Sequence, residues 1–165
     1  MSDSIYVIAN KIHIRSIRIL DERIATDPTN WATMLDAFEV HYGVRDEVSP
    51  EERLLRLVLS IGIRALNTEG QPIGLVGDYS IEYMFFIENL EDYRVEHGDA
   101  PEDLEIHEAL MHALLGIAYS TSRGIVLSRT QGTALKGVIL PVLDTKALLS
   151  SRLENAESQN SSGSK

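Results

Sequence analysis

The sequence predicts an α+β domain, in which a four-stranded antiparallel sheet carries a long helix and a short C-terminal helix on one face. Two observations predict it. Between residues 54 and 87 apolar and polar residues alternate with a period of two, and from residue 101 the apolar period becomes helical. Strands produce the first period and helices the second, and strands followed by helices form a sheet with helices on one side.

The alternation is clearest in residues 54–66, where the odd positions are apolar: Leu55, Leu57, Leu59, Ile61, Ile63 and Ala65. A second alternating run follows the loop Asn67-Thr68-Glu69-Gly70-Gln71 and reaches Ile87. A short loop with Asn and Gly between two such runs predicts a β-hairpin. The second run is also apolar on its other face, at Val76, Met84 and Phe86, so we expect something to pack against that face.

Two earlier strands complete the sheet. The first is expected from about Ile5 to Leu20, with a bulge near Arg15-Ser16 because the apolar positions change parity there. The second is expected from Phe38 to Val44, where apolar and polar residues alternate again. Between the two strands, Trp31 to Ala37 forms either a short helix or an irregular crossover.

The long helix is expected from Pro101 to Gly124, because proline and acidic residues favour a helix start and Arg-Gly favours its end. Apolar residues cover more than half of its circumference, which indicates burial on more than one side. One side can pack on the sheet. We expect the other side to join a second copy of the chain through Leu110, Leu114 and Ile117.

The remaining segments have weaker patterns. Residues 125–140 are expected to be irregular, with a small hairpin through Thr130-Gln131-Gly132-Thr133 as one interpretation. The short helix is expected to begin with Asp144 as its N-cap, and Leu143 and Leu148 are placed for a hydrophobic staple. Residues 1–154 then form a single domain, and the serine-rich residues 155–165 form a disordered polar tail.

The amino-acid composition excludes several kinds of binding partner and of metal or disulfide site. The chain has 165 residues, of which 44% are hydrophobic, a formal net charge of -10 and no cysteine. The acidic charge disfavours nucleic acid and anionic membrane surfaces, and the lack of cysteine excludes disulfides and thiolate metal sites. No run of about 18 apolar residues and no basic-then-apolar leader occurs. We therefore expect a protein that does not insert into a membrane, and the lack of cysteine fits a reducing compartment.

No sequence motif indicates catalysis or cofactor binding. His107 and His112 lie roughly 140° out of register on a helix, whereas a zinc helix needs histidines four residues apart. A Gly-x-Ser-x-Gly elbow and a glycine-rich phosphate loop are both absent from the sequence. We expect no catalytic residues, no metal and no cofactor, and an enzyme remains only a third hypothesis.

Large apolar residues on loops and on the second face of the sheet predict a binding surface instead. Methionine, valine and aromatic side chains suit an adaptable groove for apolar polypeptide segments. For any one of these residues, burial in the core or in a subunit interface is the alternative. The candidate client-binding residues are Trp31, Val76, Met84, Phe86, Val126, Val138 and Leu140.

Four segments, in order along the chain, carry a resemblance to a known family. They are the strand Arg53–Leu66, the ungapped segment Asp78–Glu91, the helix end Ser122-Arg123-Gly124, and Leu140-Pro141-Val142 before the last helix. They resemble the third strand, the fourth strand, the helix end and the last-helix entry of the SecB protein-export chaperones. The similarity extends from about Ile12 to Leu153 and implies a SecB-like fold.

The resemblance implies a cytoplasmic, ATP-independent holding chaperone that assembles as a dimer of dimers and binds unfolded or precursor polypeptides. It also implies acidic residues on the sheet that dock the translocase motor, with Asp21, Glu22 and Asp78 as candidates. The chain departs from the family at Glu82-Tyr83, which stands where the family has Gly-Gly, and in a longer segment 125–137. A SecB-like chaperone or scaffold dedicated to one partner, such as the antitoxin of a toxin–antitoxin pair, is the alternative.

Overall fold

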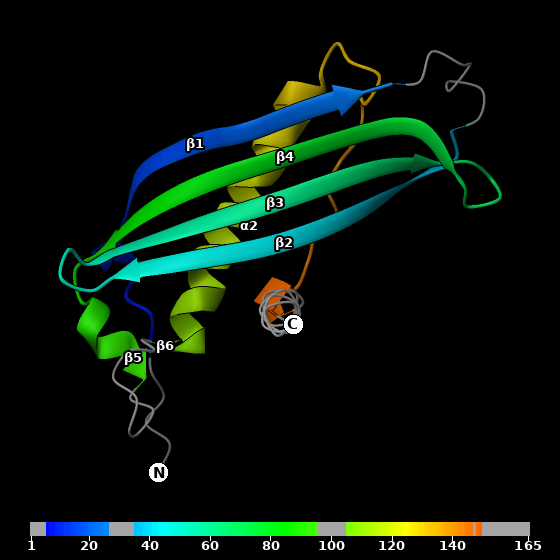
Figure 1. Ribbon diagram of the computed structural model, residues 1–165. Helices are drawn as coiled ribbons and strands as arrows, with labels where there is room; N and C mark the ends of the chain where they lie inside the picture. Colours follow the sequence, from blue (N-terminus) through cyan, green and yellow to red (C-terminus); the bar gives the residue numbers. More distant parts are fainter. Residues whose placement is uncertain (1–5, 27–34, 96–104, 147, 150–165) are drawn as a thin grey trace, which may run out of the picture.

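The computed structural model describes residues 6–26, 35–95, 105–146 and 148–149, in which one long helix crosses one face of a twisted sheet (Figure 1). The four long strands are β1 (Ile12–Ala25), β2 (Ala37–Ser49), β3 (Leu54–Leu66) and β4 (Pro72–Ile87). They are all antiparallel, in the spatial order β1-β4-β3-β2. The helix α2 spans Glu108–Thr130. The predicted α+β class, with four antiparallel strands and a long helix, is confirmed.

The shorter elements lie near the ends of the sheet. A 3-10 helix η1 (Ala9–Lys11) precedes β1, and a second one, η2 (Leu90–Tyr93), follows β4. The two-residue strands β5 (Arg94–Val95) and β6 (Glu105–Ile106) pair with each other. Near the C-terminus, residues 145–146 and 148–149 are helical, where the sequence predicts the short helix.

The predicted bulge in β1 is confirmed. The pairing of β1 with β4 shifts between Ile14 and Ser16, and it shifts a second time between Ile19 and Asp21. The second shift is not evident from the sequence. The strand also begins and ends later than predicted, because residues 21–25 continue to pair with β4 and the described residues before Ile12 form no strand.

The helix α2 differs from the predicted helix at both ends. Glu105 and Ile106 belong to β6, and the helix starts after His107, whose Nδ1 accepts a hydrogen bond from the Ala109 N–H (3.1 Å). At the other end the helix does not stop at Gly124 but continues to Thr130, so residues 125–130 of the predicted irregular segment are helical. A glycine inside a helix costs about 1 kcal/mol. Complete burial of Val126 on the next turn, worth about 1.5–3 kcal/mol, outweighs that cost.

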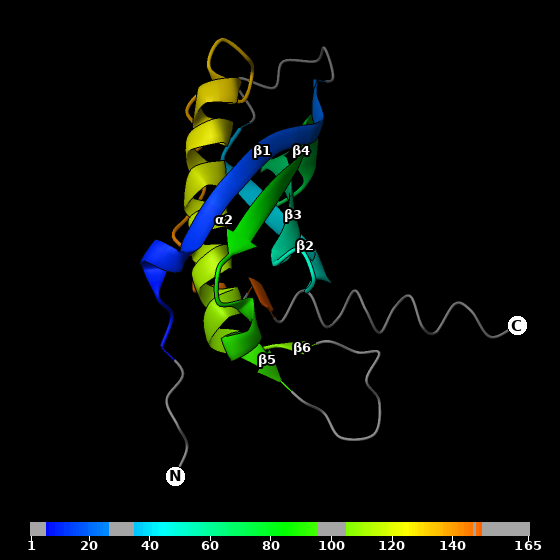
Figure 2. The same cartoon turned by 90° about the vertical axis from the view of Figure 1, so that its left-hand side faces the viewer.

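The core lies between the sheet and α2 (Figure 2). The odd-numbered residues of β3 and β4 point into it, and Leu57, Ile61 and Ile81 are at most 1% exposed. A buried hydrogen bond of 2.6 Å between the hydroxyls of Tyr83 on β4 and Ser122 on α2 fixes the helix on the sheet. We call this face of the sheet the inner face, and the opposite one the outer face.

Residues 131–137 form turns after α2, and the described residues beyond them, 138–146 and 148–149, are called the C-terminal strap. Arg123 Nε donates to the Leu140 carbonyl (3.0 Å), and the Tyr119 hydroxyl donates to the Pro141 carbonyl (2.6 Å). The Tyr119 oxygen also lies 2.9 Å from the hydroxyl of Tyr42 on β2. Burial raises the pKa of both tyrosines, which keeps their hydroxyls protonated. The strap is therefore tied to the helix and, through Tyr119, to the β2 side of the sheet.

By length and composition alone, the 23-residue helix α2 is apolar enough to cross a membrane. This differs from the expectation that no such segment occurs. In the structure, 44% of its most apolar window is buried, and the core helix of a water-soluble protein passes the same test of length and composition. It is therefore weak evidence for a membrane span.

Gly77 on β4 generates a prediction about core packing. A Cβ atom at this position would lie 2.5 Å from Cδ1 of the fully buried Leu135, so we expect Gly77→Ala to lower the free energy of unfolding by about 1–3 kcal/mol. Gly62→Ala is the control, because its Cβ would meet Asp78 Oδ1 at an ordinary 3.6 Å. Urea unfolding followed by circular dichroism measures both. Equal effects of the two substitutions would contradict the close packing of Leu135 on Gly77.

Candidate binding surfaces

The predicted client-binding residues fall on two sides of the sheet. Val76, Met84 and Phe86 lie on the outer face of β4 and are half-buried. The other three described candidates are buried in the core on the inner side, with exposed fractions of 0% to 3%: Val126, Val138 and Leu140. Trp31 lies outside the described residues. Because the sheet separates the two groups, they do not line one common groove in a single chain.

Phe86 is covered on the outer face by β1. The guanidinium of Arg15 lies 4.7 Å from the centre of the Phe86 ring, and the His13 ring lies 6.1 Å away. The bulge next to Arg15 re-aims this side chain, as bulges commonly do. A cation over an aromatic face is favourable, so the chain itself already supplies one partner for Phe86.

The predicted oligomer interface is largely part of the core of the single chain. Leu110 and Leu114 are 0% exposed, because they face the sheet, and only Ile117 is half-buried. The two leucines therefore offer no free surface to a second copy.

The exposed apolar residues lie elsewhere. On the inner side of β1, Ile14 is 45% and Ile17 is 40% exposed, and Leu127 of α2 is 40% exposed. On the strap, Ile139 is 69% and Val142 is 82% exposed. In the sequence, Ile14 and Ile17 each stand between polar residues, which predicts a strand. Their exposure could not be predicted, because it depends on β1 being an edge strand.

The candidate motor-docking residues are divided as well. Asp21 and Asp78 lie on the outer face, whereas Glu22 lies on the inner side, where its carboxylate is 3.7 Å from Arg129 of α2. In the register of β1 and β4, Arg23 stands opposite Asp78. Arg23 therefore lies beside Asp78 on the outer face, and the three carboxylates do not form one acidic surface.

A ladder of charges crosses the outer face and joins all four strands. Glu82 of β4 accepts hydrogen bonds from Arg18 of β1 (2.7 Å from Nε) and from Arg56 of β3 (2.5 Å from Nε). Arg56 in turn lies 3.4 Å from Glu47 of β2. The Glu82 side chain is only 1% exposed. The hydrogen bond from Arg56, together with that from Arg18, holds the pKa of Glu82 below its usual value and overcomes the opposing effect of burial.

Comparison with known structures identifies the fold. A Mycobacterium tuberculosis SecB-like chaperone, in complex with a ChAD peptide from the HigA1 antitoxin, matches with a TM-score of 0.59 and 20% identity, over 82% of this chain and 92% of that chain. The chain therefore has a SecB-like fold. A Streptococcus agalactiae protein of unknown function matches with a TM-score of 0.40 and 12% identity, over 79% of this chain and 97% of that one.

No family model matches this sequence. No curated protein matches it either.

The charge ladder predicts how stability depends on pH. The pKa of Glu82 is lower in the folded than in the unfolded chain, so its contribution is complete above about pH 5 and is lost as the pH falls through the folded pKa. We expect Glu82→Gln to lower the free energy of unfolding at pH 7 by about 1–3 kcal/mol. The variant should also lose less stability than the parent between about pH 5 and pH 3.

Urea unfolding at several pH values measures this effect. Glu47→Gln is the matched control, because its carboxylate is 75% exposed and its contact with Arg56 is long, so we expect no measurable change. A Glu82→Gln variant with the stability and pH profile of the parent would contradict the role given to the ladder.

Proposed function

We propose that this protein is a SecB-like chaperone that holds apolar segments of non-native polypeptides without using a nucleotide. One observation carries the proposal: large apolar side chains remain uncovered on a fold that, in the Mycobacterium tuberculosis protein, is found with a bound peptide. The proposal needs no catalytic group, because burial of apolar segments requires no covalent step.

The strap offers the most exposed apolar surface for a client. Val138 and Leu140 are buried in the core, whereas Ile139 and Val142 are exposed. Because the buried pair anchors the strap, Ile139 and Val142 stay on its outer side. Burial of an apolar side chain by a client is worth about 1.5–3 kcal/mol. The two side chains together contribute about 3–6 kcal/mol before the entropic cost of association. We therefore assign client binding to the strap, and not to the buried Val138 and Leu140 themselves.

The edge strand β1 is the surface proposed for a second copy. Its outer edge carries backbone groups that pair with no strand among the described residues, and such edges readily pair with another chain. Ile14, Ile17 and Leu127 add exposed apolar area on the same side. A stable interface buries about 800 Å² on each partner, and a 14-residue strand with a flanking helix can supply it. This surface replaces the predicted one at Leu110 and Leu114.

A chaperone dedicated to a single partner is the second candidate. The peptide bound by the Mycobacterium tuberculosis protein comes from an antitoxin, which favours a partner of that kind. Delivery of clients to an export motor is not included in the proposal, because arginines share the outer face with Asp21 and Asp78. A general holdase protects several unrelated clients, whereas a dedicated chaperone protects one.

The client surface is tested by suppression of aggregation. At equimolar chaperone, we expect the parent chain to suppress light scattering of two unrelated heat-denatured proteins, and Ile139→Asp/Val142→Asp to lose most of this effect because charge disfavours apolar contact. Tyr6→Asp/Ile8→Asp is the control, since it adds the same charge at exposed apolar residues elsewhere. If the parent protects neither protein, the general holdase is excluded and the dedicated chaperone is the candidate that remains.

The β1 surface is tested by mass in solution. We expect multi-angle light scattering to show a dimer or larger assembly of the parent chain, and Ile17→Asp to shift it toward the monomer at micromolar concentration, because a charge would be buried in the interface. The strap variant Ile139→Asp/Val142→Asp should keep the mass of the parent. A monomeric parent chain at tens of micromolar would refute the proposed interface.

A further inference from the structure

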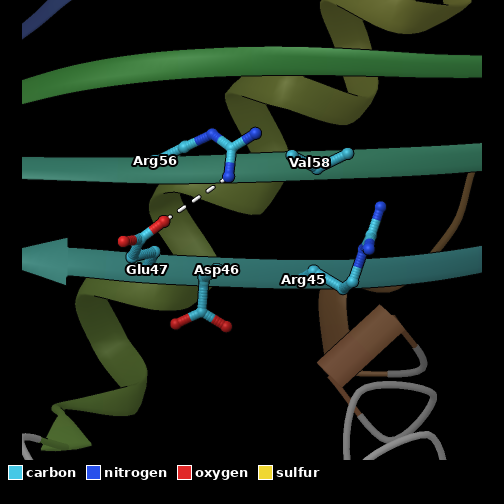
Figure 3. Close-up of a pocket in the computed structure, with 5 residues that line it drawn as sticks. All are labelled: Arg45, Asp46, Glu47, Arg56 and Val58. Atoms are coloured by element: carbon cyan, nitrogen blue, oxygen red, sulfur yellow. Dashed lines mark hydrogen bonds and ion pairs between the residues drawn. The ribbon is translucent and has the colours of Figure 1, made fainter. Parts of the chain in front are cut away.

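The outer face of the sheet contains a small pocket that the proposed chaperone function does not use. It lies over β2 and β3, has a volume of about 230 Å³ and is lined by Arg45, Asp46, Glu47, Arg56 and Val58 (Figure 3). Pockets for small-molecule ligands usually measure about 300–1,000 Å³. This pocket is therefore too small for a typical cofactor and has the size for a single side chain.

Two arginines give the pocket its charge. In the register of the sheet, Arg45 of β2 stands opposite Val58 of β3, and its side chain extends toward β3 (Figure 3). Val58 is 4% exposed and supplies an apolar floor. Arg56 is held by its hydrogen bond to Glu82. No ion pair or hydrogen bond of the Arg45 side chain is found in the described part of the chain.

We propose that this pocket binds the carboxylate of an aspartate or glutamate side chain on a protein partner that docks on the outer face. A guanidinium presents a planar set of donors that matches the two oxygens of a carboxylate. Arg45 supplies such a donor set without an internal partner. Arg56 adds a second one whose orientation is already fixed by Glu82, so little side-chain entropy is lost on binding.

The carboxylate already present in the pocket does not block this role. Glu47 is 75% exposed and its contact with Arg56 is 3.4 Å, which marks a weak surface pair. Asp46 points away from the two arginines (Figure 3). An incoming carboxylate that reaches both guanidiniums therefore replaces one weak contact by two charge-assisted ones.

The charge of the whole protein explains why such a pocket selects its partner. At a net charge of -10 the chain repels an acidic partner over most of its surface. Attraction is then confined to places where a guanidinium such as that of Arg45 can donate to an incoming carboxylate, which gives docking a defined position. The sheet separates this pocket from the strap and from the inner side of β1, so it works independently of client holding.

The test uses the full chain and two short peptides, acetyl-Ala-Leu-Glu-Leu-Ala-amide and its glutamine counterpart. Nuclear magnetic resonance follows the Nε–Hε signals of Arg45 and Arg56 during titration at low salt. We expect the glutamate peptide to shift both signals and to bind about tenfold more tightly than the glutamine peptide, as expected for one charge-assisted contact. Arg45→Gln should remove this difference.

Arg64→Gln is the matched control, because Arg64 is an exposed arginine of β3 on the same outer face, away from the pocket. This variant should keep the tenfold difference, and the circular dichroism spectra of both variants should match the parent. Equal binding of the two peptides, or an equal effect of the two arginine substitutions, overturns the proposal. Aggregation assays with Arg45→Gln should match the parent, so failure here leaves the chaperone proposal standing.

Discussion

One helix has to cover a sheet that is four strands wide, and this mismatch shapes the rest of the molecule. An α-helix is about 10 Å across, whereas four strands at about 4.8 Å spacing span nearly twice that width. The central strands β3 and β4 are accordingly buried on their inner face, while β1 at the edge keeps Ile14 and Ile17 partly exposed. The surplus apolar surface follows from geometry and not from an unusual composition.

Within the described residues, the chain covers the part of the inner face beside α2 on the β2 side. The C-terminal strap runs along α2, and the hydrogen bonds among Tyr42, Tyr119 and Pro141 tie it to the side of β2. No described segment does the same for the inner side of β1 next to Leu127. The strap in turn places Ile139 and Val142 outside. Both uncovered areas therefore arise from the same cause, and they suit two different uses, assembly of copies and holding of clients.

The outer face of the sheet carries a network of ion pairs, and no described helix packs against it. Glu82 sits at the middle of the sheet, where the guanidiniums of Arg18 and Arg56 cover it almost completely. Each strand is joined to the next by an ion pair or by a shared carboxylate. Such pairs contribute less to stability than an apolar core does, but they define which residues stand opposite one another. They also fix the direction in which Arg56 points.

The sequence by itself determined that there are four long strands and that the first has a bulge at Arg15-Ser16, because alternation and its change of parity depend only on neighbours in the chain. It did not determine where α2 ends, since packing around Val126 outweighs the glycine signal at residue 124. Nor did it determine which apolar residues are exposed to solvent. Leu110 and Ile17 are both large apolar residues of an amphipathic element, yet Leu110 is buried and Ile17 is exposed. The tertiary structure decided this, because exposure depends on strand order and on the width that one helix can cover.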